Sequence, residues 1–262
     1  MAQINIVIVI YNKSLEESQT IRTLNAPVDA VIYIADNSTV DIGNREFAET
    51  HGYYYIDMGG NKGLSCAYNS VIDMMEKGDG MVCFFDDDTT VDSRYFNALR
   101  AAVDTHPKIN VFVPVVRDRR GILSPCAIRG VFCRRISSLN ELPEHGVSVI
   151  NSGLAVRLKV FLEYRYDEGQ FLDYVDHAFI RDITGNDLSR IYIIRDVILE
   201  QEFSGSIKQS RLAAMKRYGI LCSDIRCFCK KYGISTISRQ GFLLKRRLNI
   251  WLFNRSGEKN KG

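Results

Sequence analysis

An apolar, strand-like run that ends in three consecutive carboxylates constrains the fold of this chain more than any other feature. The run covers residues 81–85, and aspartates occupy 86–88. Adjacent carboxylates repel one another unless a cation lies among them, and Mg²⁺ or Mn²⁺ prefers such oxygen ligands. Because ligands bind at the carboxyl ends of strands in an α/β sheet, we expect a metal site at that edge. The alternative is an acidic turn in which Asp92 or Ser93 caps a helix over 94–105.

Apolar runs alternate with helical patterns over the first 105 residues. The predicted strands cover 4–10, 30–35, 53–57 and 81–85, and the predicted helices cover 14–24, 63–77 and 94–105. A capping-box pattern opens the first helix, and Gly78 ends the second. This order of strands and helices predicts a parallel sheet with right-handed crossovers.

The pattern changes after residue 105. Strands are predicted over 110–116, 126–134, 148–157 and 191–199, a loop and helix over 167–183, and helical spacing from about residue 206. We therefore predict one domain, 1–205, followed by a helical extension, 206–262. Within the domain, residues 1–105 form the first half and residues 106–205 the second.

Composition predicts a folded domain in a reducing compartment. The chain has 262 residues, of which 46% are hydrophobic, enough for one large core. Its start lacks the basic region of a signal peptide, and its apolar runs stay below the roughly 18 residues that a membrane span needs. Seven cysteines without a CxxC pair argue against a disulfide framework or a zinc site. We expect a cytoplasmic protein with reduced thiols.

Charge is divided unevenly along the chain. Residues 207–262 carry 14 lysines and arginines against two acids, a net charge of +12, which leaves −9 for residues 1–206. Residues 242–253 mix the cationic cluster 245–247 with bulky apolar side chains, including the single Trp251. Such a helix can lie on an anionic membrane surface. The alternative is a helix that is docked on the predicted domain, with its charges in water. We expect no nucleic-acid partner, because no motif for one is present.

A polar segment follows each of the four parallel strands predicted first: Tyr11-Asn12, Asp36-Asn37-Ser38, Gly60-Asn61-Lys62-Gly63 and Asp86-Asp87-Asp88. In this order they resemble the inverting glycosyltransferases of family 2, which have a GT-A fold, and most of all the subgroup of bacterial rhamnosyl- and galactofuranosyltransferases. The resemblance is strong over residues 4–100 and weaker to about 205. It implies an α/β protein with a Rossmann-like nucleotide-binding half, a mixed central sheet, an acceptor-side half and C-terminal helices.

The resemblance also implies where a nucleotide sugar binds. Asp36 would contact the pyrimidine or ribose, although an ordinary turn explains this residue as well. Asn61 would lie beside the diphosphate, with Gly63 allowing close approach; a plain turn is again the alternative. Asp88 would ligate Mn²⁺ or Mg²⁺ directly, and Asp86 would act through the ribose or a metal-bound water. The predicted donor contacts are Tyr11, Asn12, Asp36, Asn61, Gly63, Asp86 and Asp87.

Residues 171–176 resemble the family segment that opens an acceptor-side helix. Inversion needs a carboxylate that takes the proton from the acceptor hydroxyl, and the alignment gives Asp176 this role. Asp173 would then be an acceptor contact or a helix N-cap, and His177 could orient Asp176. The alternatives are a solvated helix start and a surface histidine. The acceptor-side residues implied by the resemblance are Asn151, Ser152, Gly153, Asp173, Tyr174 and His177; for 151–153, a plain β-turn is the alternative.

One position departs from the family pattern. Many relatives place a histidine on the metal after the late strand, and this chain has Gln201 there. An amide oxygen binds hard cations more weakly than imidazole does, so Glu200 or Glu202 could substitute. The predicted metal ligands are Asp88, Asp86 and Gln201.

The resemblance implies a metal-dependent inverting glycosyltransferase of bacterial surface polysaccharide synthesis. Its donor would be a dTDP- or UDP-sugar carrying rhamnose, galactofuranose or another hexose, and its acceptor a lipid-linked saccharide at the inner face of the membrane. The resemblance leaves open whether the protein forms a homo-oligomer. The alternative is a non-catalytic sugar- or lipid-binding module with a degenerate metal site. A dehydrogenase is excluded because GxGxxG is absent after the first strand. A nucleotidyltransferase would place a Gly-rich basic loop there, and this chain has none.

Overall fold

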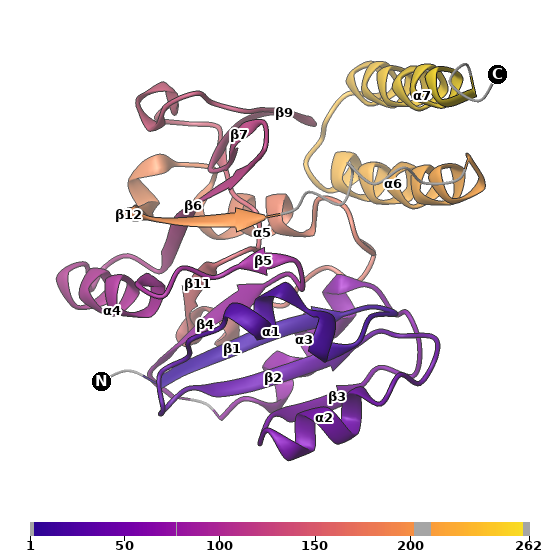
Figure 1. Ribbon diagram of the computed structural model, residues 1–262. Helices are drawn as coiled ribbons and strands as arrows, with labels where there is room; N and C mark the ends of the chain where they lie inside the picture. The colour runs from indigo at the N-terminus through magenta and orange to yellow at the C-terminus, as the bar shows by residue number, and fades with distance from the viewer. Residues whose placement is uncertain (1–2, 77, 202–210, 259–262) are drawn as a thin grey trace.

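A mixed β-sheet forms the centre of the molecule (Figure 1). The structure, a computed structural model, describes residues 3–76, 78–201 and 211–258, with side chains as far as Ile250. The strands lie in the spatial order β3 (Tyr54–Asp57), β2 (Val31–Asp36), β1 (Gln3–Ile10), β4 (Gly80–Phe85), β11 (Leu154–Arg157), β6 (Val111–Asp118), β12 (Ile191–Gln201) and β5 (Thr89–Thr90). The predicted mixed sheet is confirmed.

Strand directions decide where the functional loops lie. The first four strands, β1 to β4, are parallel, as predicted. β11 is antiparallel to both of its neighbours, β4 and β6, and β12 is parallel to β6. β6 and β12 therefore point the same way as β4. Consequently the carboxyl ends of β1, β2, β4, β6 and β12 share one edge of the sheet.

Helices cover both faces of this sheet, because successive side chains of a strand point to opposite faces. On one face, Val7 belongs to a buried cluster with α3 (Leu64–Met74) and α5 (Val175–Thr184). On the other face, Ile8 belongs to a cluster with α4 (Tyr95–Thr105). The core is thus built in two layers around strands that are apolar on both sides.

Two predicted strands are each divided in the structure. The strand expected over 126–134 is the hairpin of β8 (Cys126–Arg129) and β9 (Phe132–Arg134), because Gly130 turns the chain with φ of 60°. The strand expected over 148–157 is divided into β10 and β11 by a turn at 151–153. β10 (Val147–Ser148) and the hairpin form a second, small sheet, and β7 (Gly121–Ser124) pairs with β6.

The helices differ from the prediction near the amino terminus. The helix expected over 14–24 consists of the 3₁₀ helix η1 (Leu15–Glu17) and α1 (Gln19–Thr23), with extended backbone at Ser18 between them. Sequence periodicity missed α2 (Asn44–Thr50), which is too short to show it. Other 3₁₀ helices are η2 (Leu139–Glu141), η3 (Leu158–Leu162) and η4 (Leu188–Arg190).

Two C-terminal helices, α6 (Arg211–Lys231) and α7 (Thr236–Glu258), lie side by side at one end of the molecule (Figure 1). Ile225 and Phe228 of α6 are fully buried in a cluster with Ala178 of α5 and Val131. Within the described residues, no helix is both long and apolar enough to span a bilayer. The expected helix start near residue 206 and the chain beyond 258 lie outside the described residues.

Candidate active site

Gln201, the last residue of β12, joins two of the three aspartates that follow β4. Its side-chain Nε2 donates to Asp86 Oδ2 at 2.9 Å and to Asp88 Oδ1 at 3.0 Å. The hydroxyl of Ser152 lies 2.5 Å from Asp86 Oδ2 and 3.0 Å from Gln201 Oε1. The structure therefore brings the predicted metal ligands together and adds Ser152, which we had expected on the acceptor side.

This group of oxygens fits a hard cation. The two carboxylates face one point, where the amide NH₂ of Gln201 lies, and turning that amide over would present its Oε1 instead. Within the described residues, no three His, Cys, Asp or Glu side chains form a metal-binding group. The residues that would hold Mg²⁺ or Mn²⁺ are Asp88, Asp86 and Gln201, with ligand oxygens and water completing the shell of the ion. Glu202 lies outside the described residues.

Burial raises the pKa of both Asp86 and Asp88 above the usual range of a carboxyl group. For Asp86, hydrogen bonds from its neighbours oppose the rise in pKa, whereas the charges of Asp176 and Asp87 add to it. For Asp88, burial and then the charge of Asp86 raise the pKa to about 7. A cation favours the ionised forms, so metal and protons compete for these oxygens.

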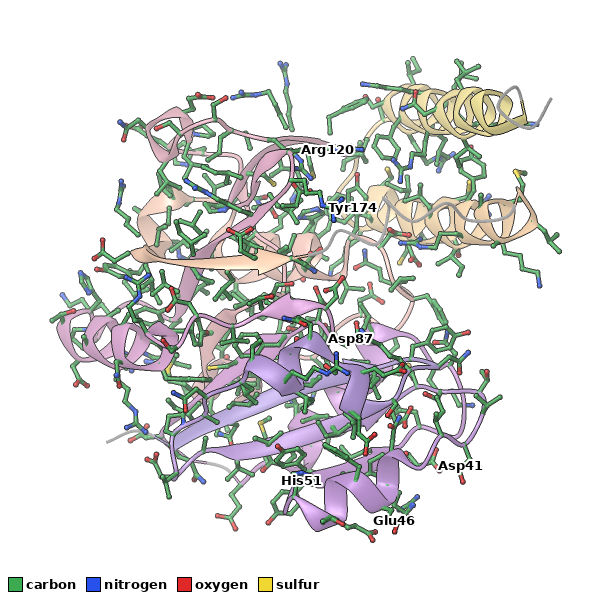
Figure 2. The ribbon with its side chains drawn as sticks, in the orientation of Figure 1. Asp41, Glu46, His51, Asp87, Arg120 and Tyr174 are labelled. Atoms are coloured by element: carbon green, nitrogen blue, oxygen red, sulfur yellow. The ribbon has the colours of Figure 1, made fainter. Side chains whose placement is uncertain are left out.

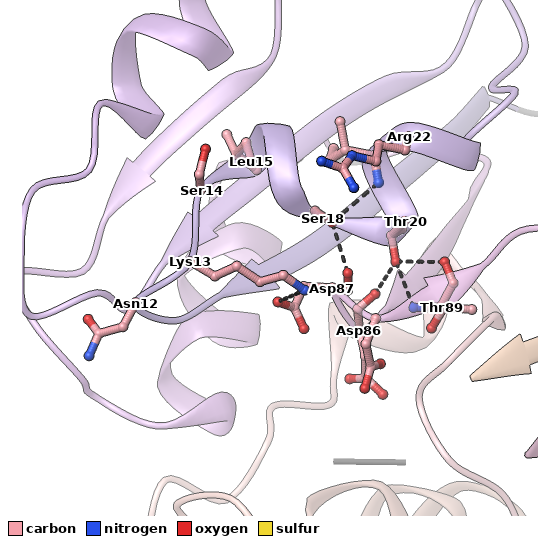
Figure 3. A network of polar contacts seen from close by, with 12 residues as sticks. Asn12, Lys13, Ser14, Leu15, Ser18, Thr20, Arg22, Asp86, Asp87 and Thr89 are labelled. Carbon is pink, nitrogen blue, oxygen red and sulfur yellow. Dashed lines mark hydrogen bonds and ion pairs between the residues drawn. The ribbon is translucent and has the colours of Figure 1, made fainter. Parts of the chain in front are cut away.

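Asp87, the middle aspartate, forms an ion pair with Lys13, whose Nζ lies 3.0 Å from Asp87 Oδ2 (Figure 3). Ser18 Oγ donates to the backbone oxygen of Asp87 at 2.9 Å, and the Thr20 hydroxyl donates to the backbone oxygen of Asp86. The loop after β1 is thus fixed to the turn after β4. No role had been predicted for Lys13.

Asp36, at the end of β2, lies in the wall of a cavity of about 580 Å³ between α2 and the ends of β2 and β3. Its carboxylate accepts hydrogen bonds from Asn44 Nδ2 (2.9 Å), the Tyr55 hydroxyl (2.9 Å) and the backbone N–H of Ser38 (2.8 Å). Burial, and then the hydrogen bond to Asp36, raise the pKa of Tyr55. The cavity opens at the carboxyl ends of two parallel strands, and periodicity alone could not reveal its α2 wall.

The other predicted donor contacts surround this edge. Tyr11 is 51% exposed, and Asn12 Oδ1 accepts the backbone N–H of Thr39 at 2.8 Å. Asn61 Oδ1 accepts the backbone N–H of Gly63 at 3.2 Å. A Cβ at Gly63 would lie 2.6 Å from the backbone oxygen of Phe171, so a close approach between the two halves requires this glycine.

The two candidate bases have different surroundings. Asp173 forms a two-contact ion pair with Arg217 of α6, with Nη2 at 2.7 Å from Oδ1. Asp176, in the first turn of α5, is close enough to Asp86 that its charge helps to raise the pKa of Asp86. The helix cap is Tyr174, in the left-handed region with φ of 64°, so the alternative that Asp173 caps α5 is wrong.

Neighbouring side chains hold this helix start in place. His177 Nδ1 lies 2.7 Å from Ser148 Oγ and 3.8 Å from Asp176 Oδ1. The Tyr174 hydroxyl donates to the backbone oxygen of Val131. The Tyr174 ring packs on the ring of Phe228 in α6, with 4.9 Å between the ring centroids. Tyr174 and His177 therefore hold the start of α5, which carries Asp176, against its neighbours.

The turn at 151–153 packs against the end of β4, next to the aspartates. Gly153 has φ of 77°, donates its backbone N–H to Phe84 at 2.8 Å, and leaves no room for a Cβ, which would meet Leu199 at 2.5 Å. Asn151 is 3% exposed, and its Oδ1 is buried without a hydrogen-bond partner in the described part of the chain. An unpaired buried acceptor beside this site is available to a ligand or to water.

Asp224 is the functional residue that sequence reasoning missed most clearly. It is fully buried in α6, and its carboxylate accepts the backbone N–H groups of Phe171 (2.8 Å), Leu172 (2.9 Å) and Asp173 (2.7 Å). α6 therefore fixes the loop that leads into Asp176. A signal was present, since Asp224 is one of only two acids among residues 207–262.

Comparisons with known proteins agree with this geometry. Residues 5–126 match the model of glycosyl transferase family 2. The chain is 29% identical over 175 residues to a dTDP-rhamnosyl transferase, RfbF of Shigella flexneri, covering 65% of this chain and 59% of RfbF. It therefore spans less than two thirds of that relative.

Solved structures share the fold. Residues 1–349 of S. aureus TarS, in complex with UDP-GlcNAc, give a TM-score of 0.55 at 14% identity, over 95% of this chain and 73% of that one. Glucosyl-3-phosphoglycerate synthase from Mycobacterium tuberculosis, in complex with Mn²⁺, UDP and glucosyl-3-phosphoglycerate, gives 0.56 at 16% identity, over 89% and 81%. The expected GT-A fold is confirmed.

Proposed function

We propose that this chain is a member of glycosyl transferase family 2 and moves a sugar from a dTDP- or UDP-sugar to an acceptor hydroxyl with inversion, in a metal-dependent reaction. The observation that carries the proposal is the convergence of Asp86, Asp88 and Gln201 beside Asp176. A binding module has no need for a free carboxylate next to a cation site. The non-catalytic alternative is therefore not favoured.

Each part of the site has a separate task. Asp36 and its cavity would hold the nucleoside, and Asp88, Asp86 and Gln201 would hold Mn²⁺ or Mg²⁺. The ion supplies the charge that neutralises the departing diphosphate. Asp176 would take the proton from the acceptor hydroxyl, because Asp173 is engaged by Arg217.

We infer that the donor is dTDP-rhamnose, since the relative RfbF is named a dTDP-rhamnosyl transferase. UDP-galactofuranose and other UDP-hexoses are the competing donors. A panel of these nucleotide sugars with Mn²⁺, read as protection against thermal unfolding, tests the assignment. A ligand at 100 times its Kd adds about 2.7 kcal/mol of stability. Equal protection by every nucleotide sugar would contradict a rhamnose preference.

The acceptor would be a lipid-linked saccharide of a bacterial surface polysaccharide, met at the cytoplasmic face of the membrane. Support comes from α7, where Lys245, Arg246 and Arg247 are exposed together with Leu244 (59%) and Leu248 (49%). Cations beside exposed leucines suit an anionic lipid surface. The side chains of Trp251 and Leu252, which we had expected on this face, lie outside the described part of the chain.

A further inference from the structure

An arginine-rich segment lies within the otherwise acidic body of the protein. Residues 117–135 contain six arginines and a single acid, Asp118, although residues 1–206 together carry a net charge of −9. The segment runs from the end of β6 through β7 and the β8–β9 hairpin. Neither the cavity beside Asp36 nor the acidic group formed by Asp86, Asp88 and Gln201 accounts for this concentration of charge.

Four of these arginines line a cavity of about 550 Å³. They are Arg117, Arg119, Arg120 and Arg135, and the acids of its lining are Asp118 and Glu200. This cavity is separate from the one beside Asp36, with which it shares no lining residue.

The carboxylate of Asp118 is engaged by two neighbouring arginines of the cavity. Arg135 Nη1 donates to Asp118 Oδ1 and Arg135 Nη2 donates to Asp118 Oδ2, each at 2.6 Å. Asp118 Oδ1 also accepts the backbone N–H of Arg120 at 2.8 Å. Arg117 and Arg120 form no ion pair with any residue of the described ranges. Within the described ranges, the guanidinium groups of Arg117 and Arg120 thus line the cavity with no carboxylate at ion-pair distance, although the charge of Arg120 helps to lower the pKa of Asp118.

The cavity lies on the acceptor side of the candidate active site. Glu200, in its wall, precedes Gln201 on β12 and is paired in register with Arg117 of β6. The cavity and Gln201 therefore share the carboxyl ends of β6 and β12, although successive side chains leave a strand on opposite faces. Figure 2 shows Asp41 of the nucleoside cavity at the bottom, Asp87 in the middle and Arg120 at the top. In this view Asp87, the middle aspartate, lies between a residue of each cavity.

We propose that this arginine cavity binds a phosphate or diphosphate group carried by the acceptor, an inference that rests on the proposed glycosyl transfer. A guanidinium group stays charged at all working pH values and matches phosphate oxygens with two parallel hydrogen bonds. The donor diphosphate has its own place at the acidic group. An anion on the opposite side of that group therefore belongs to the other substrate.

The test is calorimetric titration with inorganic pyrophosphate in EDTA, which removes metal-dependent binding at the aspartates. The double variant Arg117→Gln/Arg120→Gln should bind pyrophosphate at least about tenfold more weakly than the wild type, since each lost charge-assisted hydrogen bond costs about that much. The matched control is Arg129→Gln/Arg134→Gln, which removes the same two charges from the same segment outside the cavity, and it should bind as the wild type does. Equal binding by the double variant, or no binding by the wild type, overturns the proposal.

A second arm distinguishes a phosphate site from a lipid surface. On vesicles of phosphatidylglycerol and phosphatidylcholine, the double variant should bind as the wild type does, because α7 supplies the proposed membrane contact. Loss of vesicle binding with unchanged pyrophosphate binding would overturn the proposal. Because neither arm needs donor or metal, a failure here is distinguishable from a wild-type protein that turns over no nucleotide sugar.

Discussion

Asp224 accepts the backbone N–H of Asp173 at 2.7 Å, although 51 residues separate them in the sequence. With the bonds to Phe171 and Leu172, this carboxylate satisfies three consecutive amides of the loop before α5. The C-terminal segment is therefore part of the acceptor-side architecture as far as α6.

Asp224→Asn should lower the free energy of unfolding by about 2–4 kcal/mol, because a buried carboxylate that accepts three hydrogen bonds becomes an amide with one acceptor oxygen. Urea unfolding measures the loss. The loop would also shift beside Asp176, so kcat should fall by about tenfold to a hundredfold. Donor affinity should stay unchanged, since the nucleoside cavity lies at β2 and β3.

Asp182→Asn is the matched control for Asp224→Asn. Asp182 also connects α5 to α6, through Lys231 Nζ at 2.7 Å, but it lies near the surface. Its replacement should cost less than about 1 kcal/mol, as is typical of exposed pairs. Equal losses in the free energy of unfolding in the two variants would show that the buried contacts of Asp224 stabilise the protein no more than the ion pair of Asp182 does.

Asp176→Asn should preserve donor affinity and lower kcat by at least about 10²-fold, because general-base catalysis contributes 10²–10⁴-fold. Asp173→Asn should do less, since Arg217 already engages both oxygens of that carboxylate. Steady-state kinetics with a fixed donor compare the two variants. A larger loss of kcat in Asp173→Asn would move the base to Asp173.

The parallel half of the fold could be read from the sequence because its strands are continuous apolar runs that end in polar segments. Asp86 and Asp88 were likewise predictable, since they directly follow a strand, and the resemblance to the family indicated Gln201. The contacts of Asp224 and Arg217 were not, because they depend on how α6 docks against a loop 50 residues earlier. The division of the strand predicted over 126–134 also escaped prediction, since β-branched and apolar residues continue on both sides of Gly130.

Gln201→His should tighten Mn²⁺ binding, since imidazole is a better ligand than an amide for transition ions. The structure places the side chain between both carboxylates, so the new ring would lie beside the ion. Gln201→Leu, which has no donor atom, is the control and should weaken binding. Calorimetric titration with Mn²⁺ gives both affinities. Unchanged values in both variants would mean that β12 does not reach the ion.

Replacing the three exposed cations of α7, Lys245, Arg246 and Arg247, by Gln should weaken binding to anionic liposomes by roughly a hundredfold, since each cation contributes about 1 kcal/mol near such a surface. Leu244→Ser/Leu248→Ser should reduce the binding that persists in high salt, because apolar burial is not screened. Co-sedimentation measures both. Wild-type protein that ignores anionic liposomes at low salt would contradict the membrane assignment.

The most direct test of the account is the turnover of dTDP-rhamnose by the wild-type protein and by Asp88→Ala, each with Mn²⁺ and with EDTA. We predict release of dTDP by the wild type only when Mn²⁺ is present, and none by Asp88→Ala under either condition, with the thermal unfolding of the metal-free proteins showing that the variant remains folded. Turnover by Asp88→Ala at the wild-type rate, or wild-type turnover that persists in EDTA, would contradict a metal-dependent transfer centred on Asp88.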